Sequence, residues 1–121
     1  ELFAAHCPGL PYETVREALA DSVPLFGRGH VFSNVLVGLG ETDGELDRCV
    51  DGLVALGVVP VLRPLTPAAG CRNLPRPTPE RLVRAARHLS RALDRAGLDP
   101  SGALSMCGAC TGCDLAAWRD L

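Results

Sequence analysis

The sequence contains no lysine and few aromatic residues, and both deficits narrow the classes of function. All 12 basic residues of this 121-residue chain are arginines, a bias that we attribute to a GC-rich genome. The formal net charge is −2, and aromatic residues make up 4% of the chain. Neither attraction to a polyanion nor stacking of bases on aromatic rings is therefore indicated, and we expect no nucleic-acid partner.

Long apolar runs are also absent. No stretch reaches the roughly 18 continuous apolar residues that a membrane span requires, and the N-terminus has no signal-peptide pattern. We therefore expect a cytoplasmic protein without a membrane partner. A hydrophobic fraction of 47% is enough for the core of a single domain. The chain begins at Glu1 without a methionine, and we expect it to be the C-terminal portion of a larger protein.

Hydrophobic periodicity predicts three helices that alternate with two strands. The helices begin at proline or capping residues, and the strands are almost continuously apolar, which is typical of strands buried on both faces. This alternation is typical of parallel α/β architecture, either part of a (β/α) barrel or part of a doubly wound sheet. The expected elements are a helix over 12–26, a strand over 30–38, a helix over 42–57, a strand over 58–65 and a helix over 78–97.

The strongest local signal is the closely spaced cysteine triplet Cys107, Cys110 and Cys113. C-x2-C-x2-C is the first part of the bacterial ferredoxin run that binds a [4Fe–4S] cluster. Zinc is the alternative, if Cys7, Cys71 or a histidine supplies a fourth ligand. A disulfide is disfavoured because three thiols leave one unpaired. The clustering favours a metal or cluster site in a reducing cytosol.

Two further features concern the surface of the predicted fold. Ligands of parallel α/β proteins bind at the carboxyl ends of the strands, where Arg63 interrupts an apolar run. Its permanent charge favours either an anionic ligand or a salt bridge within the fold. The last predicted helix carries arginines at spacings of three and four, which we interpret as its solvated back rather than a basic groove. These are Arg81, Arg84, Arg87, Arg91 and Arg95.

Four stretches of the chain, in order and over about 95 residues, resemble the radical S-adenosylmethionine enzymes similar to biotin synthase. ELFAAHCPGLPYETVREAL is similar to the helix region after the family's fourth strand. VFSNVLVGLGET matches the pattern G-x-I-x-G-x-x-E at Leu36, Gly38 and Glu41, with Asn34 where the family often has Gly. VPVLRPLTPAAGC resembles the sixth strand and its P-x-x-G-T continuation, with Cys71 in the Thr position. TPERLVRAARHL resembles the helix that follows.

The resemblance implies a fold, a chemistry and a set of cofactor contacts. The fold would be the C-terminal part of a TIM-like (β/α) barrel over residues 1–98, followed by a Cys-rich segment over residues 99–121. The family cleaves S-adenosylmethionine reductively to a 5′-deoxyadenosyl radical at a [4Fe–4S] cluster held by C-x3-C-x2-C. That motif is absent here. The resemblance therefore implies that a missing N-terminal half binds the primary cluster and most of S-adenosylmethionine, and that the fragment alone would be inactive. The residues implied to contact S-adenosylmethionine are Asn34, Leu36, Gly38, Glu41, Leu62, Arg63 and Pro64.

By the same resemblance, Cys107, Cys110 and Cys113 would hold an auxiliary [4Fe–4S] cluster. The implied partners are S-adenosylmethionine, a small-molecule substrate and an electron donor such as ferredoxin or flavodoxin. The implied role is radical chemistry in cofactor biosynthesis or modification. Two alternatives stay open: an iron–sulfur or zinc module on an α/β scaffold without radical chemistry, and a (β/α)-barrel lyase with a zinc clip.

Overall fold

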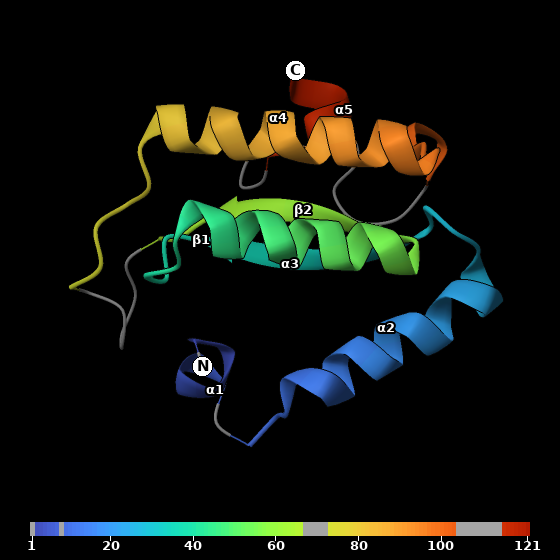
Figure 1. Cartoon of the computed structure of the whole chain (residues 1–121), viewed down its shortest axis with the longest axis horizontal. Coiled ribbons are helices and arrows are strands. Elements are labelled where there is room, and N and C mark those ends of the chain that lie inside the picture. Colours follow the sequence, from blue (N-terminus) through green and yellow to red (C-terminus); the bar gives the residue numbers. More distant parts are fainter. Residues whose placement is uncertain (1, 8, 67–72, 104–114) are drawn as a thin grey trace.

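Helices and strands alternate along most of the chain (Figure 1). The structure is a computed structural model, and it describes residues 2–7, 9–66, 73–103 and 115–121. None of the described helices is both long and apolar enough to cross a bilayer. The elements are α1 (Leu2–His6), α2 (Tyr12–Phe26), β1 (Val31–Val37), α3 (Asp43–Leu56), β2 (Val58–Pro64), α4 (Pro79–Ala96), the 3-10 turn η1 (Pro100–Gly102) and α5 (Ala117–Asp120).

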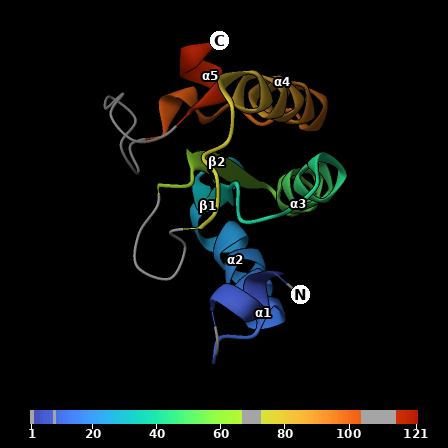
Figure 2. The same ribbon diagram turned by 90° about the vertical axis from the view of Figure 1, so that its left-hand side faces the viewer.

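The two strands pair in parallel and form the centre of the molecule. Val31 lies opposite Val58 and Val37 lies opposite Pro64, so both carboxyl ends reach the same edge of the sheet. The connection between the strands runs through α3, as a parallel pair requires. Figure 2 shows α3 on one side of the sheet, with α4 above it and α1 and α2 below.

The prediction that the chain forms the C-terminal part of a TIM-like barrel is wrong. Closing a barrel requires every strand to have a strand neighbour on both sides, whereas the described residues form a single sheet of two strands. Beyond that pair, the described chain adds one isolated antiparallel bridge, between Leu62 and Leu115. The alternation of elements that suggested a barrel reflects two consecutive β/α units, and two units cannot close on themselves.

The hydrophobic core joins the sheet to the helices. Val37, Leu62 and Leu89 are fully buried at 0% exposure. Burying a side chain of this size contributes about 1.5–3 kcal/mol. A two-stranded sheet is marginal by itself, so the apolar stripes of α3 and α4 provide the cover that the strands need. The buried residues of α4 are Ala85, Ala86, Leu89, Ala92 and Leu93.

The predicted starts of α3 and α4 are confirmed by their capping contacts. The Thr42 hydroxyl accepts the Glu45 N–H at 3.2 Å, and Glu45 Oε2 accepts the Thr42 N–H at 2.7 Å, so the capping box is complete. The Thr78 hydroxyl accepts the Arg81 N–H at 3.3 Å at the start of α4. All five predicted elements are present, whereas α1, η1 and α5 were not predicted. Each of these three is five residues or fewer, too short to show a period.

The last described residues return to the core. Leu115 donates its N–H to the Leu62 carbonyl at 2.9 Å, and Ala117 is 2% exposed. The Trp118 ring lies 6.1 Å from the Phe32 ring, centroid to centroid. Residues after 98 therefore contribute packing to the sheet, and the predicted division into 1–98 and 99–121 stays a prediction.

Candidate functional site

Two polar side chains from neighbouring strands meet near the carboxyl ends of the sheet. Arg63 Nε donates a hydrogen bond of 3.0 Å to Asn34 Oδ1. In the parallel register Arg63 lies opposite Leu36, two residues beyond Asn34. Because side chains alternate between faces, Asn34, Leu36 and Arg63 share one face of the sheet. We call this face, defined by those three residues, the open face.

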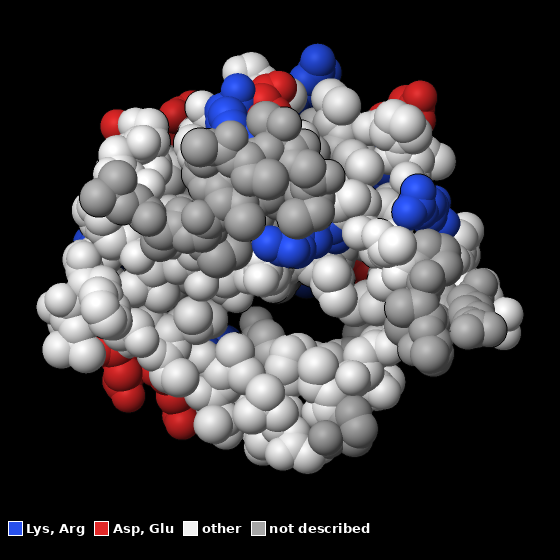
Figure 3. All heavy atoms as spheres, turned by 180° about the vertical axis from the view of Figure 1, so that it is seen from behind, with Lys and Arg blue, Asp and Glu red and all other residues white. Residues whose placement is uncertain are grey.

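The open face is the more exposed side of β1. The opposite face of β1 carries three buried valines, Val31, Val35 and Val37, at 8%, 8% and 0% exposure. On the open face, Leu36 is 46% exposed. Viewed from behind, on the side of the sheet opposite α3, largely uncharged surface surrounds an opening, and basic side chains border it (Figure 3). The contact of Phe32 with Trp118 covers the amino-terminal end of this face.

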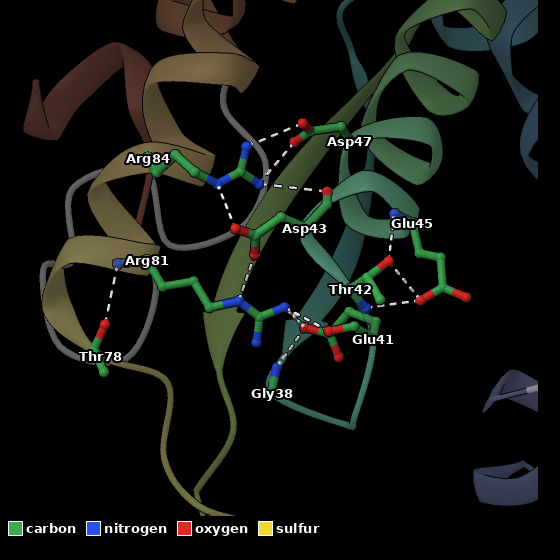
Figure 4. Close-up of polar contacts among 9 residues, drawn as sticks. All are labelled: Gly38, Glu41, Thr42, Asp43, Glu45, Asp47, Thr78, Arg81 and Arg84. Atoms are coloured by element: carbon green, nitrogen blue, oxygen red, sulfur yellow. Dashed lines mark hydrogen bonds and ion pairs between the residues drawn. The ribbon is translucent and has the colours of Figure 1, made fainter.

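Gly38 and Glu41 lie in the loop between β1 and α3, and their described contacts are to each other and to α4. The Gly38 N–H donates to Glu41 Oε1 at 2.8 Å. The same oxygen lies 3.0 Å from Arg81 Nη2, which also donates to the Glu41 carbonyl at 2.7 Å (Figure 4). Glu41 Oε2 is buried without a hydrogen-bond partner. Glu41 thus links the loop to the start of α4.

The backbone conformation and close packing at position 38 also require glycine. Its φ is +110°, a conformation that L residues rarely adopt, and an added Cβ would lie 3.0 Å from Pro77 Cδ. The loop therefore passes close to the segment that leads into α4. The glycine at position 38, which matches the family's G-x-I-x-G-x-x-E pattern, is thus explained by its positive φ and by its close approach to Pro77.

The remaining predicted cofactor residues, Leu62 and Pro64, differ in exposure. Leu62 is fully buried, and its carbonyl accepts the Leu115 N–H. Pro64 ends β2 opposite Val37. The structure thus brings Asn34, Leu36 and Arg63 together on one face, holds Gly38 and Glu41 in the adjoining loop, and places the Leu62 side chain in the core.

Sequence reasoning missed a clamp of ion pairs between α3 and α4. Arg84 donates to both carboxylate oxygens of Asp47, at 3.0 and 2.9 Å, and Arg81 Nε donates to Asp43 at 2.8 Å (Figure 4). Arg84 Nε lies 3.2 Å from Asp43 Oδ2 but is not aligned for a hydrogen bond. The Arg84 hydrogen bonds lower the pKa of Asp47, and the hydrogen bond with Asp47 raises the pKa of Arg84.

The interpretation of the α4 arginines as a solvated back is therefore wrong for Arg81 and Arg84. His88 extends the clamp, because its Nε2 lies 2.9 Å from Asp51 Oδ1. A signal for this clamp exists in the sequence. Acidic residues recur every four positions on α3, and basic residues recur every three or four positions on α4, which places both sets on single helix faces.

No cluster of three or more histidine, cysteine or acidic side chains suited to a metal ion occurs within the described ranges. Cys71, Cys107, Cys110 and Cys113 lie outside those ranges. Of the other thiols, Cys7 is exposed and Cys49 packs against the core, where burial raises its pKa and the negative charge of Glu41 raises it further. The cysteine triplet stays the predicted metal site.

No family model, curated protein or solved structure matches this chain. The resemblance to radical S-adenosylmethionine enzymes is therefore carried by the four stretches of sequence alone.

Proposed function

We propose that this chain is part of a radical S-adenosylmethionine enzyme, that its open face binds the methionine carboxylate of the cofactor, and that Cys107, Cys110 and Cys113 hold an auxiliary [4Fe–4S] cluster. The observation that carries the proposal is the contact of Arg63 with Asn34 at the carboxyl end of the parallel strands. Parallel α/β proteins bind their ligands at this edge.

The chemistry of Arg63 supports an anionic ligand. A guanidinium keeps its charge at any physiological pH and matches the geometry of a carboxylate. The contact from Nε to Asn34 Oδ1 orients its plane, and Leu36 supplies exposed apolar surface beside it. A ligand with a charged end and an apolar or aromatic body fits this combination, and S-adenosylmethionine has both.

The anchoring of the C-terminal tail supports a cluster near this site. Leu115 follows Cys113 by two residues in the sequence, and its N–H bonds to Leu62, which immediately precedes Arg63. Three thiolates are the donor set of the bacterial ferredoxin run and leave one iron of a [4Fe–4S] cluster open to another ligand. When bound, such a cluster supplies an electron or a coordination position. The residues of the chain hold it and orient what lies beside it.

The cluster is tested by anaerobic reconstitution of the chain with ferrous iron and sulfide, followed by metal and sulfide analysis. We expect roughly four irons and four sulfides per chain, and their loss in the variant C107A/C110A/C113A. Cys49→Ala is the matched control, because this thiol packs in α3, and it should keep the full iron content. One zinc per chain without labile sulfide would instead support the zinc module and reject the cluster.

The cofactor is tested by equilibrium dialysis of labelled S-adenosylmethionine against the reconstituted chain. Arg63→Gln should weaken binding about ten-fold, because a bidentate charged contact is lost. Arg95→Gln, on the exposed side of α4, should leave binding unchanged. Unchanged binding by Arg63→Gln, or an equal loss of binding by Arg95→Gln, would contradict this role of the open face.

A further inference from the structure

The outward face of α4 carries an open depression of about 550 Å³. It lies on the solvent side of the helix, next to the clamp that joins α4 to α3. Its lining combines arginines with the apolar side chain of Val83, which is 38% exposed. The lining residues are Pro79, Glu80, Val83, Arg84, Arg87 and Arg91.

The arginines of this depression differ in what they already bind. Arg84 already forms ion pairs with Asp43 and Asp47, so it lines the depression without an unpaired charge to offer. Arg87 and Arg91 are exposed, and neither forms an ion pair with the described part of the chain. They lie four positions apart, so their side chains are neighbours on one helix face, with Cβ atoms about 5–6 Å apart. Val83 precedes Arg87 by one turn on the same stripe.

We propose that this depression docks an acidic segment of a partner protein. Two carboxylates of the segment pair with Arg87 and Arg91, and an apolar side chain one turn beyond the carboxylate at Arg87 packs on Val83. Guanidinium and carboxylate groups form paired hydrogen bonds that fix orientation as well as register. A helix with acidic residues four positions apart presents its carboxylates at the spacing of the two arginines.

The lining favours an acidic polypeptide over other anionic partners. Glu80 places a negative charge at the rim, which repels a continuous phosphate backbone. None of the described lining residues is an aromatic ring on which a base could stack. Its apolar surface is limited to Val83 and Pro79, far less than the continuous apolar face of a membrane-bound helix. Neither nucleic acid nor a lipid surface matches this combination of groups.

The proposal is tested by fluorescence anisotropy with a labelled alanine-based helical peptide that carries two glutamates four positions apart and a leucine one turn before the first glutamate. We expect saturable binding that weakens with added salt, because exposed ion pairs are screened. The variant R87Q/R91Q should weaken binding about ten-fold or more. Arg95→Gln is the matched control, an exposed arginine of α4 outside the depression, and should change binding less than about two-fold.

A charge reversal distinguishes loss of the ion pairs from loss of the fold. R87E/R91E should fail to bind the glutamate peptide and should bind the same peptide with lysines in place of glutamates. No saturable binding of the glutamate peptide, or an equal effect of Arg95→Gln, overturns the proposal. Tighter binding of single-stranded DNA or of phosphatidylserine vesicles, dependent on Arg87 and Arg91, also overturns it and reassigns the surface. The assay needs no metal cluster, so its outcome is independent of the proposed function.

Discussion

Arg81 joins the start of α4 to the loop after β1 through Glu41. One guanidinium nitrogen, Nη2, lies 3.0 Å from Glu41 Oε1 and donates to the Glu41 carbonyl at 2.7 Å. The Glu41 side chain is 9% exposed and that of Arg81 is 24% exposed. Because the Gly38 N–H also donates to Glu41, a single carboxylate connects the loop after β1 with the start of α4.

Removing one partner of this pair should destabilise the fold strongly. Arg81→Ala leaves the Glu41 carboxylate buried without its countercharge, which typically costs about 3–5 kcal/mol. We expect a loss near the lower end of this range in the free energy of urea unfolding, since Arg81 is partly solvated. Arg95→Ala, on the exposed side of the same helix, should stay within about 0.5 kcal/mol of the wild type. Equal effects of the two substitutions would contradict the role of the pair.

The contact of Asp47 with Arg84 should make stability depend on acidic pH. Hydrogen bonds from Arg84 lower the pKa of Asp47 in the folded state. The stabilisation is therefore complete above the unfolded pKa, about 3.9, and is lost as the pH falls through the lower folded value. Asp47→Asn should cost about 1 kcal/mol at pH 7. Its deficit relative to the wild type should shrink below about pH 4.

Urea unfolding at several pH values measures this difference. The matched control is Asp94→Asn on α4, since the Asp94 side chain forms no ion pair with the described residues. Its free energy of unfolding should run parallel to that of the wild type across the whole range. A deficit of Asp47→Asn that persists unchanged at pH 2.5 or so would contradict the assignment to this carboxylate.

Local signals in the sequence predicted the elements because their causes are local. Thr42 with Glu45 and Thr78 with Pro79 satisfy the free N–H groups of a helix start, and these contacts span only a few residues. Glycine at position 57 ends α3 in the left-handed conformation for an equally local reason. Such contacts can be inferred from spacing alone, without knowledge of the remaining chain.

Contacts between distant residues could not be inferred in the same way. The Asn34 contact with Arg63 depends on the register of two strands, and the Arg81 contact with Glu41 depends on how α4 sits against a loop 40 positions earlier. Sheet closure is also a property of the whole set of strands. The barrel prediction assigned two β/α units to part of a larger barrel, and periodicity carries no information on that step.

Two glycines should respond in opposite directions to alanine. Gly38→Ala puts a side chain on a residue with φ +110° and brings Cβ to 3.0 Å from Pro77 Cδ. Backbone strain and overpacking together should cost about 2–3 kcal/mol. Gly52→Ala lies within α3, where an added Cβ meets nothing within 4 Å, and should stabilise by about 0.5–1 kcal/mol. Thermal unfolding of both variants should therefore give melting temperatures on either side of the wild type.

The contact of Trp118 with Phe32 should couple the C-terminal tail to the sheet. Their ring centroids are 6.1 Å apart with an interplanar angle of 59°, a favourable tilted geometry. Trp118→Ala should lower the free energy of unfolding by about 2 kcal/mol, less than for a fully buried tryptophan. Phe26→Ala is the control, because this ring is 69% exposed and should contribute little.

A double-mutant cycle separates the ring contact from general packing. Phe32→Leu and Trp118→Leu, alone and combined, should reveal a coupling of about 0.5–1.5 kcal/mol in urea unfolding followed by far-ultraviolet circular dichroism. Circular dichroism is needed because Trp118 is the only tryptophan and its removal abolishes the fluorescence signal. Strictly additive effects would mean that the tail packs beside Phe32 without a specific ring contact.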